Sequence, residues 1–505
     1  TNLAADVTTS GTQTYTGAVT TDGSRTLQGS PVNFASTVTG TTAATDDLTI
    51  TGILDLDGAI TDINDLYVSG TSNIGANITT TGTQEYNNNV TLSGAARTLT
   101  TSGDTVTFTG TVNGGQDLTV DTNGTDNGSS LATVQFGNTV GNSTAVGAVL
   151  ITGNLDLNAA VTSATSLEET GTSDLGANVT TTSTQTYTGA VTLSGGDRTL
   201  TGSTVNFVST LAGGTNALTV TGNLDLDGAA TGLTTLDVSG TSNLGANVTT
   251  SSTQTYTGAV TLSVDTTLTT TDSNVSFLAT VDGDGTARDL TIDTNGNTGT
   301  ILFDGLVGAS NDLDVIDITG NLDLDAAIAN TTSLSVSGTS NLGANVTTSS
   351  TQTYTGAVTL SGADRTLTGS TINFVSTLAG GTHALTITGA LDLDGAATGL
   401  STLSVSGTSN LGANVTTSGT QTYTGAVTLS TDVTLTTTNS NVSFSSTVDS
   451  DAALTKRDLT LTLGSGSATF GGVVGATSLA DMTLNSSATF NAAVTADNLT
   501  LAASK

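Results

Sequence analysis

The sequence predicts an all-β protein, a right-handed parallel β-solenoid without significant helix. Three observations lead to this fold class: short phrases recur through the 505 residues, apolar and polar residues alternate with a period of two, and glycines separate the alternating segments. A short segment of this kind cannot bury an apolar face alone, but segments stacked about 4.8 Å apart enclose a continuous narrow core. With coils of roughly 20–25 residues, the chain would form roughly 20–25 coils.

The clearest repeat is the phrase Thr-Gln-Thr-Tyr-Thr-Gly-Ala-Val. The steps between its successive tyrosines alternate between roughly 70 and roughly 100 residues, so short and long blocks alternate. These tyrosines are Tyr15, Tyr187, Tyr256, Tyr354 and Tyr423, together with Tyr86 in the diverged copy Thr-Gln-Glu-Tyr-Asn-Asn-Asn-Val. We therefore divide one continuous solenoid, residues 1–505, into the blocks 15–85, 86–186, 187–255, 256–353, 354–422 and 423–505.

Phenylalanines keep the same spacing inside the blocks. One follows each of these tyrosines by roughly 20 residues, and each long block carries another one roughly 25–30 residues later. A coil of roughly 20–25 residues accounts for both offsets. We interpret the long block as the short block with one additional coil inserted. The first group comprises Phe34, Phe108, Phe207, Phe277, Phe374 and Phe444, and the additional ones are Phe136, Phe303 and Phe470.

Residues 203–248 illustrate what each coil contains. Val205 and Phe207 alternate with Thr204 and Asn206, which is the pattern of a strand with one buried face. Glycines between such segments suit turns, because glycine adopts a positive φ without steric cost. No segment keeps a 3.6-residue apolar period, so we expect essentially no helix.

The charge balance excludes some classes of partner. The chain has 42 acidic and 8 basic residues, for a formal net charge of −34. Phosphate backbones require lysine and arginine, so we expect no nucleic-acid partner, and anionic membrane surfaces are disfavoured. The strong negative charge keeps a β-rich chain dissolved and opposes lateral aggregation.

Other features concern location and extent. No run of about 18 apolar residues is present, so we expect no insertion into a membrane. The absence of cysteine is compatible with an extracellular location, because a long solenoid does not need disulfides. Thr1 lies inside a repeat phrase and no signal peptide is visible, so we expect a segment of a longer protein.

The phrase Thr-Gln-Thr-Tyr-Thr-Gly-Ala-Val-Thr-Leu, together with repeated Thr-Leu-Thr-Val-Thr-Gly strands, resembles the repeats of giant exoproteins of Gram-negative bacteria. These are the filamentous-haemagglutinin-type and autotransporter-like proteins, and the resemblance covers the whole chain through its composition and repeat style. It implies a β-helix, export to the cell surface, and a role in adhesion or in an extracellular filament. It provides no functional residue that carries over to this sequence.

Glycine-rich loops with several oxygen donors are the candidates for a Ca²⁺ site, because hard cations prefer oxygen ligands. The candidate ligands are Asp121, Asn123, Asp126, Asp282, Asp284, Asp293 and Asn295. These loops lack the Gly-Gly-x-Gly-x-Asp nonapeptide of calcium-binding β-rolls. Asp and Asn beside Gly are also ordinary turn residues, so both interpretations stay open.

Catalysis has little support. His383 is the only histidine and replaces Asn216 of an earlier repeat, and there is no cysteine nucleophile or histidine cluster. The aspartates follow the repeat, as in Leu-Asp-Leu-Asp with Asp225 and Asp227, which we expect on a solvated face. We therefore predict that the chain is not an enzyme and requires no cofactor, with Ca²⁺ as the one optional ligand.

Three further residue types repeat. We expect the arginines to pair locally with aspartates, and the repeated tyrosines to span a core edge with their hydroxyls at the surface. Sequon asparagines fit either glycosylation or, preferably, a turn and ladder role. A Thr-x-Thr row on successive coils would indicate ice binding, but the Thr-Gln-Thr-Tyr phrase returns only once in three or four coils. The sequon asparagines with this spacing are Asn77, Asn178, Asn247, Asn345 and Asn414.

These observations favour a structural, secreted protein of the cell surface, a rigid part of a fibre, adhesin stalk or filament. The alternative is a self-assembling filament or sheath subunit with Ca²⁺-assisted contacts. Ice binding and a polysaccharide-active enzyme are distant alternatives. The expected partners are other copies of the chain, end to end or side by side, or a cell-surface or glycan ligand that binds outside this segment.

Overall fold

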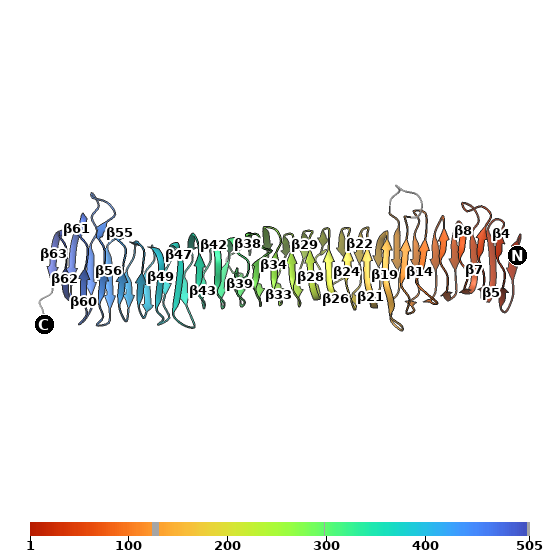
Figure 1. The fold of residues 1–505 in the computed structure, drawn as a ribbon, viewed down its shortest axis with the longest axis horizontal. Helices are drawn as coiled ribbons and strands as arrows, with labels where there is room; N and C mark the ends of the chain where they lie inside the picture. Colours follow the sequence, from red (N-terminus) through yellow and green to blue (C-terminus); the bar gives the residue numbers. More distant parts are fainter. Residues whose placement is uncertain (124–130, 297, 502–505) are drawn as a thin grey trace. The chain divides into compact units, whose positions relative to one another are not determined.

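The computed structural model describes residues 1–123, 131–296 and 298–501. Parallel strands stack as a β-solenoid of about 25 turns, and the described residues contain no helix, which confirms the predicted fold class (Figure 1). Consequently no described helix has the length and apolar character needed to cross a membrane. The chain divides into two compact units, Thr1–Ser251 (unit 1) and Ser252–Lys505 (unit 2), which we describe separately.

Unit 1 shows how three strands make one coil. Strands β8 (Ile60–Ile63), β9 (Leu66–Val68) and β10 (Ser72–Ile74) lie parallel to β11 (Ile78–Thr80), β12 (Gln84–Tyr86) and β13 (Val90–Leu92). The register aligns Leu66 with Gln84 and Ser72 with Val90, so one complete coil separates the members of each pair. Each coil therefore contributes one strand segment to each of three columns.

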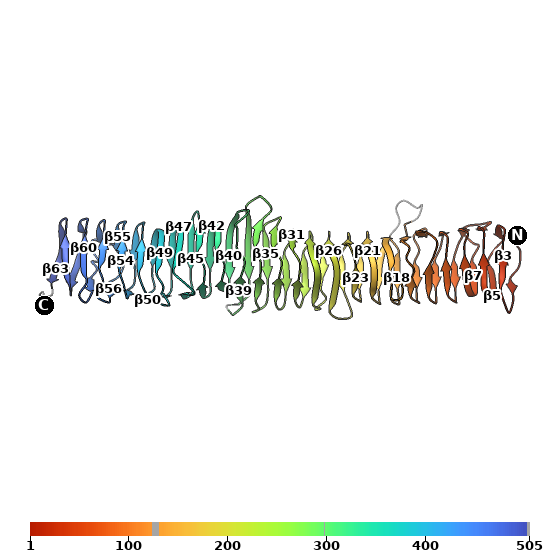
Figure 2. The same ribbon diagram turned by 60° about the horizontal axis from the view of Figure 1, so that its bottom comes forward.

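Coil length varies with the loops between strands. The coil from Leu66 to Gln84 is shorter than the predicted length of roughly 20–25 residues. A longer coil aligns Leu118 of β17 (Leu118–Asp121) with Val149 of β19 (Val146–Thr152). The ladder continues past such a loop because the strand segments on either side of it pair again with those of the next coil. Figure 2 shows loops that project beyond the strands while the strands stay stacked.

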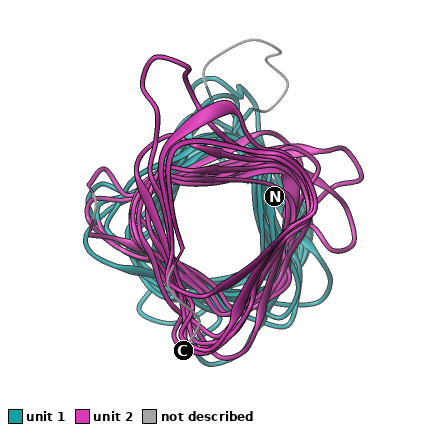
Figure 3. Cartoon of the chain, turned by 90° about the vertical axis from the view of Figure 1, so that its left-hand side faces the viewer, with its two compact units in different colours: residues 1–251 teal, residues 252–505 magenta. Residues whose placement is uncertain are grey.

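Unit 2 repeats this arrangement. Strands β44 (Val346–Thr348), β45 (Thr351–Tyr354) and β46 (Val358–Leu360) form one coil, which pairs with β47 (Arg365–Phe374) and β48 (Leu378–Ala379). Viewed along the axis, the coils of unit 2 superimpose as closed loops around a centre that inward side chains fill (Figure 3).

The core is built from inward residues at a period of two. In β26 (Arg198–Phe207), Val205 and Phe207 are fully buried while Asn206 between them is partly exposed, as the alternation predicts. Each repeated tyrosine stacks on the phenylalanine of the next coil, with ring centroids 5.2–5.5 Å apart. The predicted spacing between each tyrosine and its phenylalanine is therefore the length of one coil in this region.

The additional coil of the long block is confirmed by the register. In the short block, Phe34 aligns directly with Leu56 of the Leu-Asp-Leu strand. In the long block, Phe108 aligns with Phe136, which in turn aligns with Leu157 of the same phrase. One phenylalanine-bearing coil therefore lies between two coils that are adjacent in the short block.

The blocks do not contain a whole number of coils. In unit 1, Tyr15 aligns with Phe34, Tyr86 with Phe108 and Tyr187 with Phe207, and these pairs belong to three different columns. In unit 2, the pairs that begin at Tyr256, Tyr354 and Tyr423 likewise occupy three different columns. Each block thus moves the aromatic stack to another face, which spreads the bulky rings around the core.

The prediction for the tyrosine hydroxyl was wrong. Tyr354 is fully buried, and its hydroxyl donates to Oε1 of Gln352 over 3.1 Å. Gln352 is also fully buried, and its Nε2 donates to the Thr368 carbonyl over 2.8 Å. We expected the tyrosine hydroxyl to be satisfied at the surface. The glutamine two residues earlier accepts its hydrogen bond instead, because both side chains point into the core. The same bond forms at Tyr86, Tyr187, Tyr256 and Tyr423.

Removal of one hydroxyl should weaken this region. Tyr354→Phe leaves the buried Oε1 of Gln352 without a donor, so we expect a loss of about 1–3 kcal/mol of local stability. Native-state hydrogen exchange of peptides covering residues 346–374 would measure it. Tyr67→Phe, at a side chain that is 36% exposed, is the matched control. Equal effects of the two substitutions would contradict a role for the buried bond.

Candidate functional site

The first candidate cation loop follows β17. Asp121 ends this strand, and its Oδ1 accepts the backbone N–H of Asn123 over 3.0 Å. This contact closes a turn within the loop, which is ordinary behaviour for an aspartate two residues before the donor. Asp126 lies outside the described residues.

The second group divides between three local roles. Oδ1 of Asp282, a residue only 9% exposed, accepts the backbone N–H of Ser310 over 3.0 Å. Asp284 forms an ion pair of 2.9 Å with Arg288, and the hydrogen bonds from this arginine and from a backbone amide lower the pKa of Asp284. Asp293 accepts the backbone N–H of Asn295 over 2.7 Å. Each carboxylate thus serves its own turn or ion pair.

The structure does not bring the described candidates, which exclude Asp126, together into a centre. Within residues 1–123, 131–296 and 298–501, no three His, Cys, Asp or Glu side chains lie where they could hold one metal ion. The turn interpretation accounts for the described carboxylates without a cation. Calcium binding stays a prediction, with no set of ligands assembled for it among these residues.

One turn position recurs in every long block, and the sequence analysis missed it. The position directly follows a valine that aligns with a valine of the preceding coil, Val90, Val260 or Val427. It is occupied by Asn113, Asp282 and Asp449. Their Oδ1 atoms accept, each over 3.0 Å, the backbone N–H groups of Ser143, Ser310 and Thr477. Alignment of the three long blocks would have shown that Asn and Asp interchange here. This interchange of Asn and Asp indicates that the side-chain oxygen accepts a backbone N–H group, because a cation site would favour the carboxylate of Asp.

The prediction of arginine–aspartate pairing was wrong for the arginines of the Arg-Thr-Leu phrase. Arg198 is 8% exposed, and its guanidinium donates to the carbonyls of Leu175 (2.8 Å) and Asp197 (2.7 Å). Burial lowers the pKa of Arg198. This planar group bridges coil corners by binding backbone carbonyls, which its several donors allow. Arg25, Arg97 and Arg365 also donate to backbone carbonyls.

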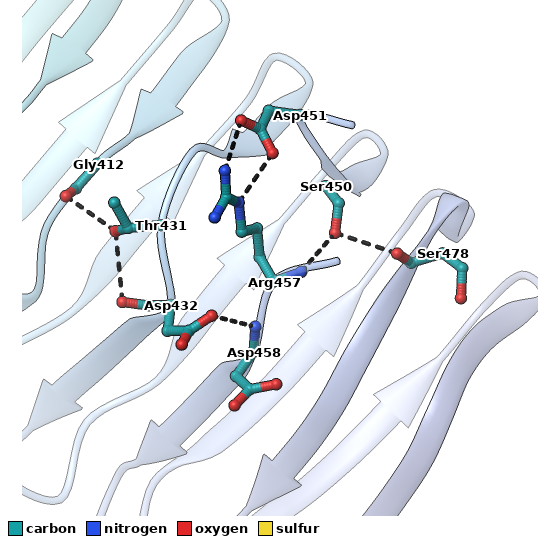
Figure 4. Close-up of polar contacts among 8 residues, drawn as sticks. All are labelled: Gly412, Thr431, Asp432, Ser450, Asp451, Arg457, Asp458 and Ser478. Atoms are coloured by element: carbon teal, nitrogen blue, oxygen red, sulfur yellow. Dashed lines mark hydrogen bonds and ion pairs between the residues drawn. The ribbon is translucent and has the colours of Figure 1, made fainter. Parts of the chain in front are cut away.

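The prediction is confirmed for the two arginines that precede Asp-Leu-Thr strands. Arg288 pairs with Asp284, and Arg457 pairs with Asp451 through two hydrogen bonds of 2.9 and 3.0 Å. Figure 4 shows the second pair at a loop corner, where Asp432 also accepts the backbone N–H of Asp458 over 3.0 Å. These pairs are partly exposed, so they hold loops in place and contribute little to global stability.

The Leu-Asp-Leu-Asp phrase makes a ladder on the outer face. Asp225 is half-buried, and its Oδ1 accepts the side-chain N–H of Asn243 in the next coil over 2.8 Å, whereas Asp227 is exposed. Both aspartates thus lie on the outer face, as expected, and the first one also bonds to the next coil. The same Asp–Asn bond joins Asp55 with Asn73, Asp323 with Asn341 and Asp392 with Asn410.

The sequon asparagines have a structural role at coil corners. The Oδ1 of Asn345 accepts the backbone N–H of Thr366 in the next coil over 2.9 Å. Equivalent bonds form at Asn77, Asn178 and Asn414. This contact supports the ladder interpretation of these residues, and their glycosylation stays a prediction.

The argument against a hydroxyl array counted one phrase only and was incomplete. In unit 2, the register places Thr366, Thr386, Ser404, Thr422 and Ser443 on one column in five successive coils. Each is followed two residues later, on the same face, by Thr368, Thr388, Ser406, Thr424 and Ser445. Different phrases supply successive rows, so counting only the Thr-Gln-Thr-Tyr phrase underestimated the array.

His383 lies in a turn in which its backbone N–H donates to the Gly380 carbonyl over 2.8 Å. The equivalent Asn216 makes the same backbone bond to Gly213. The substitution therefore keeps this backbone bond, while the side chain of Asn216 also donates to the Leu193 carbonyl over 3.1 Å. No protein-family model, curated protein or solved structure matches this chain.

Substitution of Asp282 distinguishes turn closure from cation binding. Asp282→Asn should keep the loop ordered, because Asn113 plays this role naturally, whereas Asp282→Ala should cost about 1–2 kcal/mol of local stability. Limited proteolysis within residues 308–312, with calcium and with chelator, would measure both. A calcium-dependent protection that Asp282→Asn abolishes would instead assign Asp282 to a cation site.

Proposed function

We propose that this chain is a structural segment of an extracellular surface protein, in which the solenoid serves as a stalk or fibre. The observation that carries the proposal is the continuous pairing of coils within each unit. In one coil of unit 1, Ile60, Leu66 and Ser72 each donate a backbone N–H to the following coil over 2.9–3.1 Å, one from each column. Such pairing resists bending and sliding between neighbouring coils.

The side-chain contacts support the same function. Asp–Asn ladders, Arg–carbonyl bridges and the asparagines at the corners all connect one coil with the next, and the predicted cation ligands hold turns. The recurring polar groups of the described residues thus have mechanical roles. The resemblance to Gram-negative exoproteins adds the extracellular location, and the net charge of −34 would keep the surface hydrated.

Two assemblies follow from this function. In a stalk, single copies act as spacers, and binding occurs in parts of the protein beyond this segment. In a filament, copies associate with one another, and the acidic surface requires screening or Ca²⁺ to bring negatively charged chains together. We favour the stalk, because the described carboxylates of the candidate loops already hold turns or ion pairs.

Electron microscopy and light scattering of residues 1–505, with calcium and with chelator, would test this choice. The stalk predicts monomeric particles in both solutions. Uniform fibres in both solutions would contradict the stalk and favour the filament. Fibres that disappear with chelator would assign the acidic loops to assembly.

The hydroxyl array of unit 2 favours ice binding as a second candidate function. A regular two-column surface of hydroxyls is able to order water, but two of its five rows are serine and lack the methyl group of threonine. Thermal hysteresis of residues 1–505 would measure this activity, and Thr386→Asp, in the second of the five rows, should abolish it. An outward substitution outside the array, Thr255→Asp, is the control. Absence of hysteresis in the unsubstituted protein would exclude the candidate.

A further inference from the structure

One buried position departs from the repeat in a single copy. The phrase that contains Leu-x-Val-Ser-Gly-Thr-Ser has a buried valine at its third residue in four copies, at Val68, Val238, Val336 and Val405. The copy in the block 86–186 has Glu169 there, and this residue is also fully buried (0% exposed). A carboxyl group therefore replaces an aliphatic side chain in the core of unit 1.

The described strands that flank Glu169 carry no positively charged residue. Glu169 ends β21 (Val161–Glu169) and lies between Ile151 of β19 and Tyr187 of β24 (Gln185–Tyr187). Tyr187 is the one titratable group that faces it from these strands. The charged residues nearest in sequence are Glu168, in β21, and Asp174, in β22 (Ser173–Leu175). Both side chains point outward.

The two carboxyl oxygens have unequal environments. Oε2 accepts a hydrogen bond from the hydroxyl of Ser173 over 3.0 Å. Oε1 is buried and has no partner among the described residues. An ionised carboxylate is therefore one hydrogen bond short in a place without solvent, which is far costlier than burial of the neutral acid.

The partner serine shows that the pair is specific to this copy. Ser173 belongs to the Ser-Asn-Leu strand of the repeat, whose serine is buried in every copy. Where valine stands at the position of Glu169, the hydroxyl has no partner among the described residues: Ser72, Ser242, Ser340 and Ser409. Glu169 thus satisfies one hydroxyl that the repeat leaves unpaired, but adds an ionisable group to the core.

We propose that Glu169 makes its coil a pH-responsive weak point of unit 1, closed while the carboxyl is protonated and locally opened once it ionises. Burial raises the pKa of Glu169 to about 7 against an ordinary value of 4.5, although the Ser173 hydrogen bond and the Gly171 backbone act in the opposite direction. Because the folded-state pKa is raised, the stability of this coil is greatest below pH 4.5. It falls as the pH rises towards 7.

Hydrogen exchange of residues 1–505 at pH 5 and pH 8, corrected for the intrinsic exchange rate, tests the proposal. Peptides covering residues 146–187 should open more often at pH 8, by about tenfold for each pH unit of effective pKa difference. Peptides around Val336, the equivalent valine copy in unit 2, should not change. Glu169→Val, which restores the residue of the other copies, and Glu169→Gln should both remove the pH dependence.

Two further variants complete the test. Glu168→Gln removes the neighbouring outward carboxylate and should leave the pH dependence intact. Val336→Glu places a carboxyl beside Ser340 and should transfer the pH dependence to unit 2. The proposal is overturned if protection of residues 146–187 changes equally in the unsubstituted protein and in Glu169→Val.

Discussion

Backbone hydrogen bonding between successive coils is the constraint on which the rest of the structure depends. Each of the three strand segments of a coil must align with a segment of the next, so side chains of one column always lie above one another. This alignment turns single contacts into ladders, such as Asp225 with Asn243 and Tyr187 with Phe207. Long loops lie between strands, and where a strand carries an extra residue, as between Ile60 and Ile63, the register shifts locally and pairing then resumes.

The same constraint explains how polar groups enter a narrow core. Gln352 and Tyr354 both point inward because they are two residues apart on one strand, so each provides a partner for the other. Glu169 and Ser173 form a similar pair across a coil corner, but this pair includes an ionisable group. The first arrangement is neutral at all physiological pH values, whereas the second depends on protonation. The glutamine–tyrosine pair thus stabilises the core at any physiological pH, whereas the glutamate–serine pair does so only while the carboxyl group is protonated.

The repeat and the coil have different lengths, and this difference has a consequence for the surface. Since each block moves the aromatic stack to another column, every outward feature of the repeat also visits all three faces within a unit. Accumulation of bulky residues on one side of the core would bend the solenoid. Their movement from column to column avoids such accumulation. Duplication of a block preserves the fold. Pairing depends only on the offset between neighbouring coils, so a block can begin on any of the three faces.

The sequence by itself determined the fold class, the blocks, the additional coil and the one-coil spacing of the aromatic residues, because a period of two and a fixed offset translate directly into inward residues and aligned coils. Two of the arginine pairs were also predictable, since Arg288 lies four residues from Asp284. Only the tertiary structure decided the partners across coils: the Leu175 carbonyl that Arg198 binds, the Ser310 amide that Asp282 caps, the Thr368 carbonyl that Gln352 binds, and the hydroxyl array. The physical reason is that these contacts join segments of different coils, far apart in the sequence, and loop length sets which residues meet. The candidate cation ligands looked alike in sequence, but in the folded chain each described carboxylate serves a turn or an ion pair of its own.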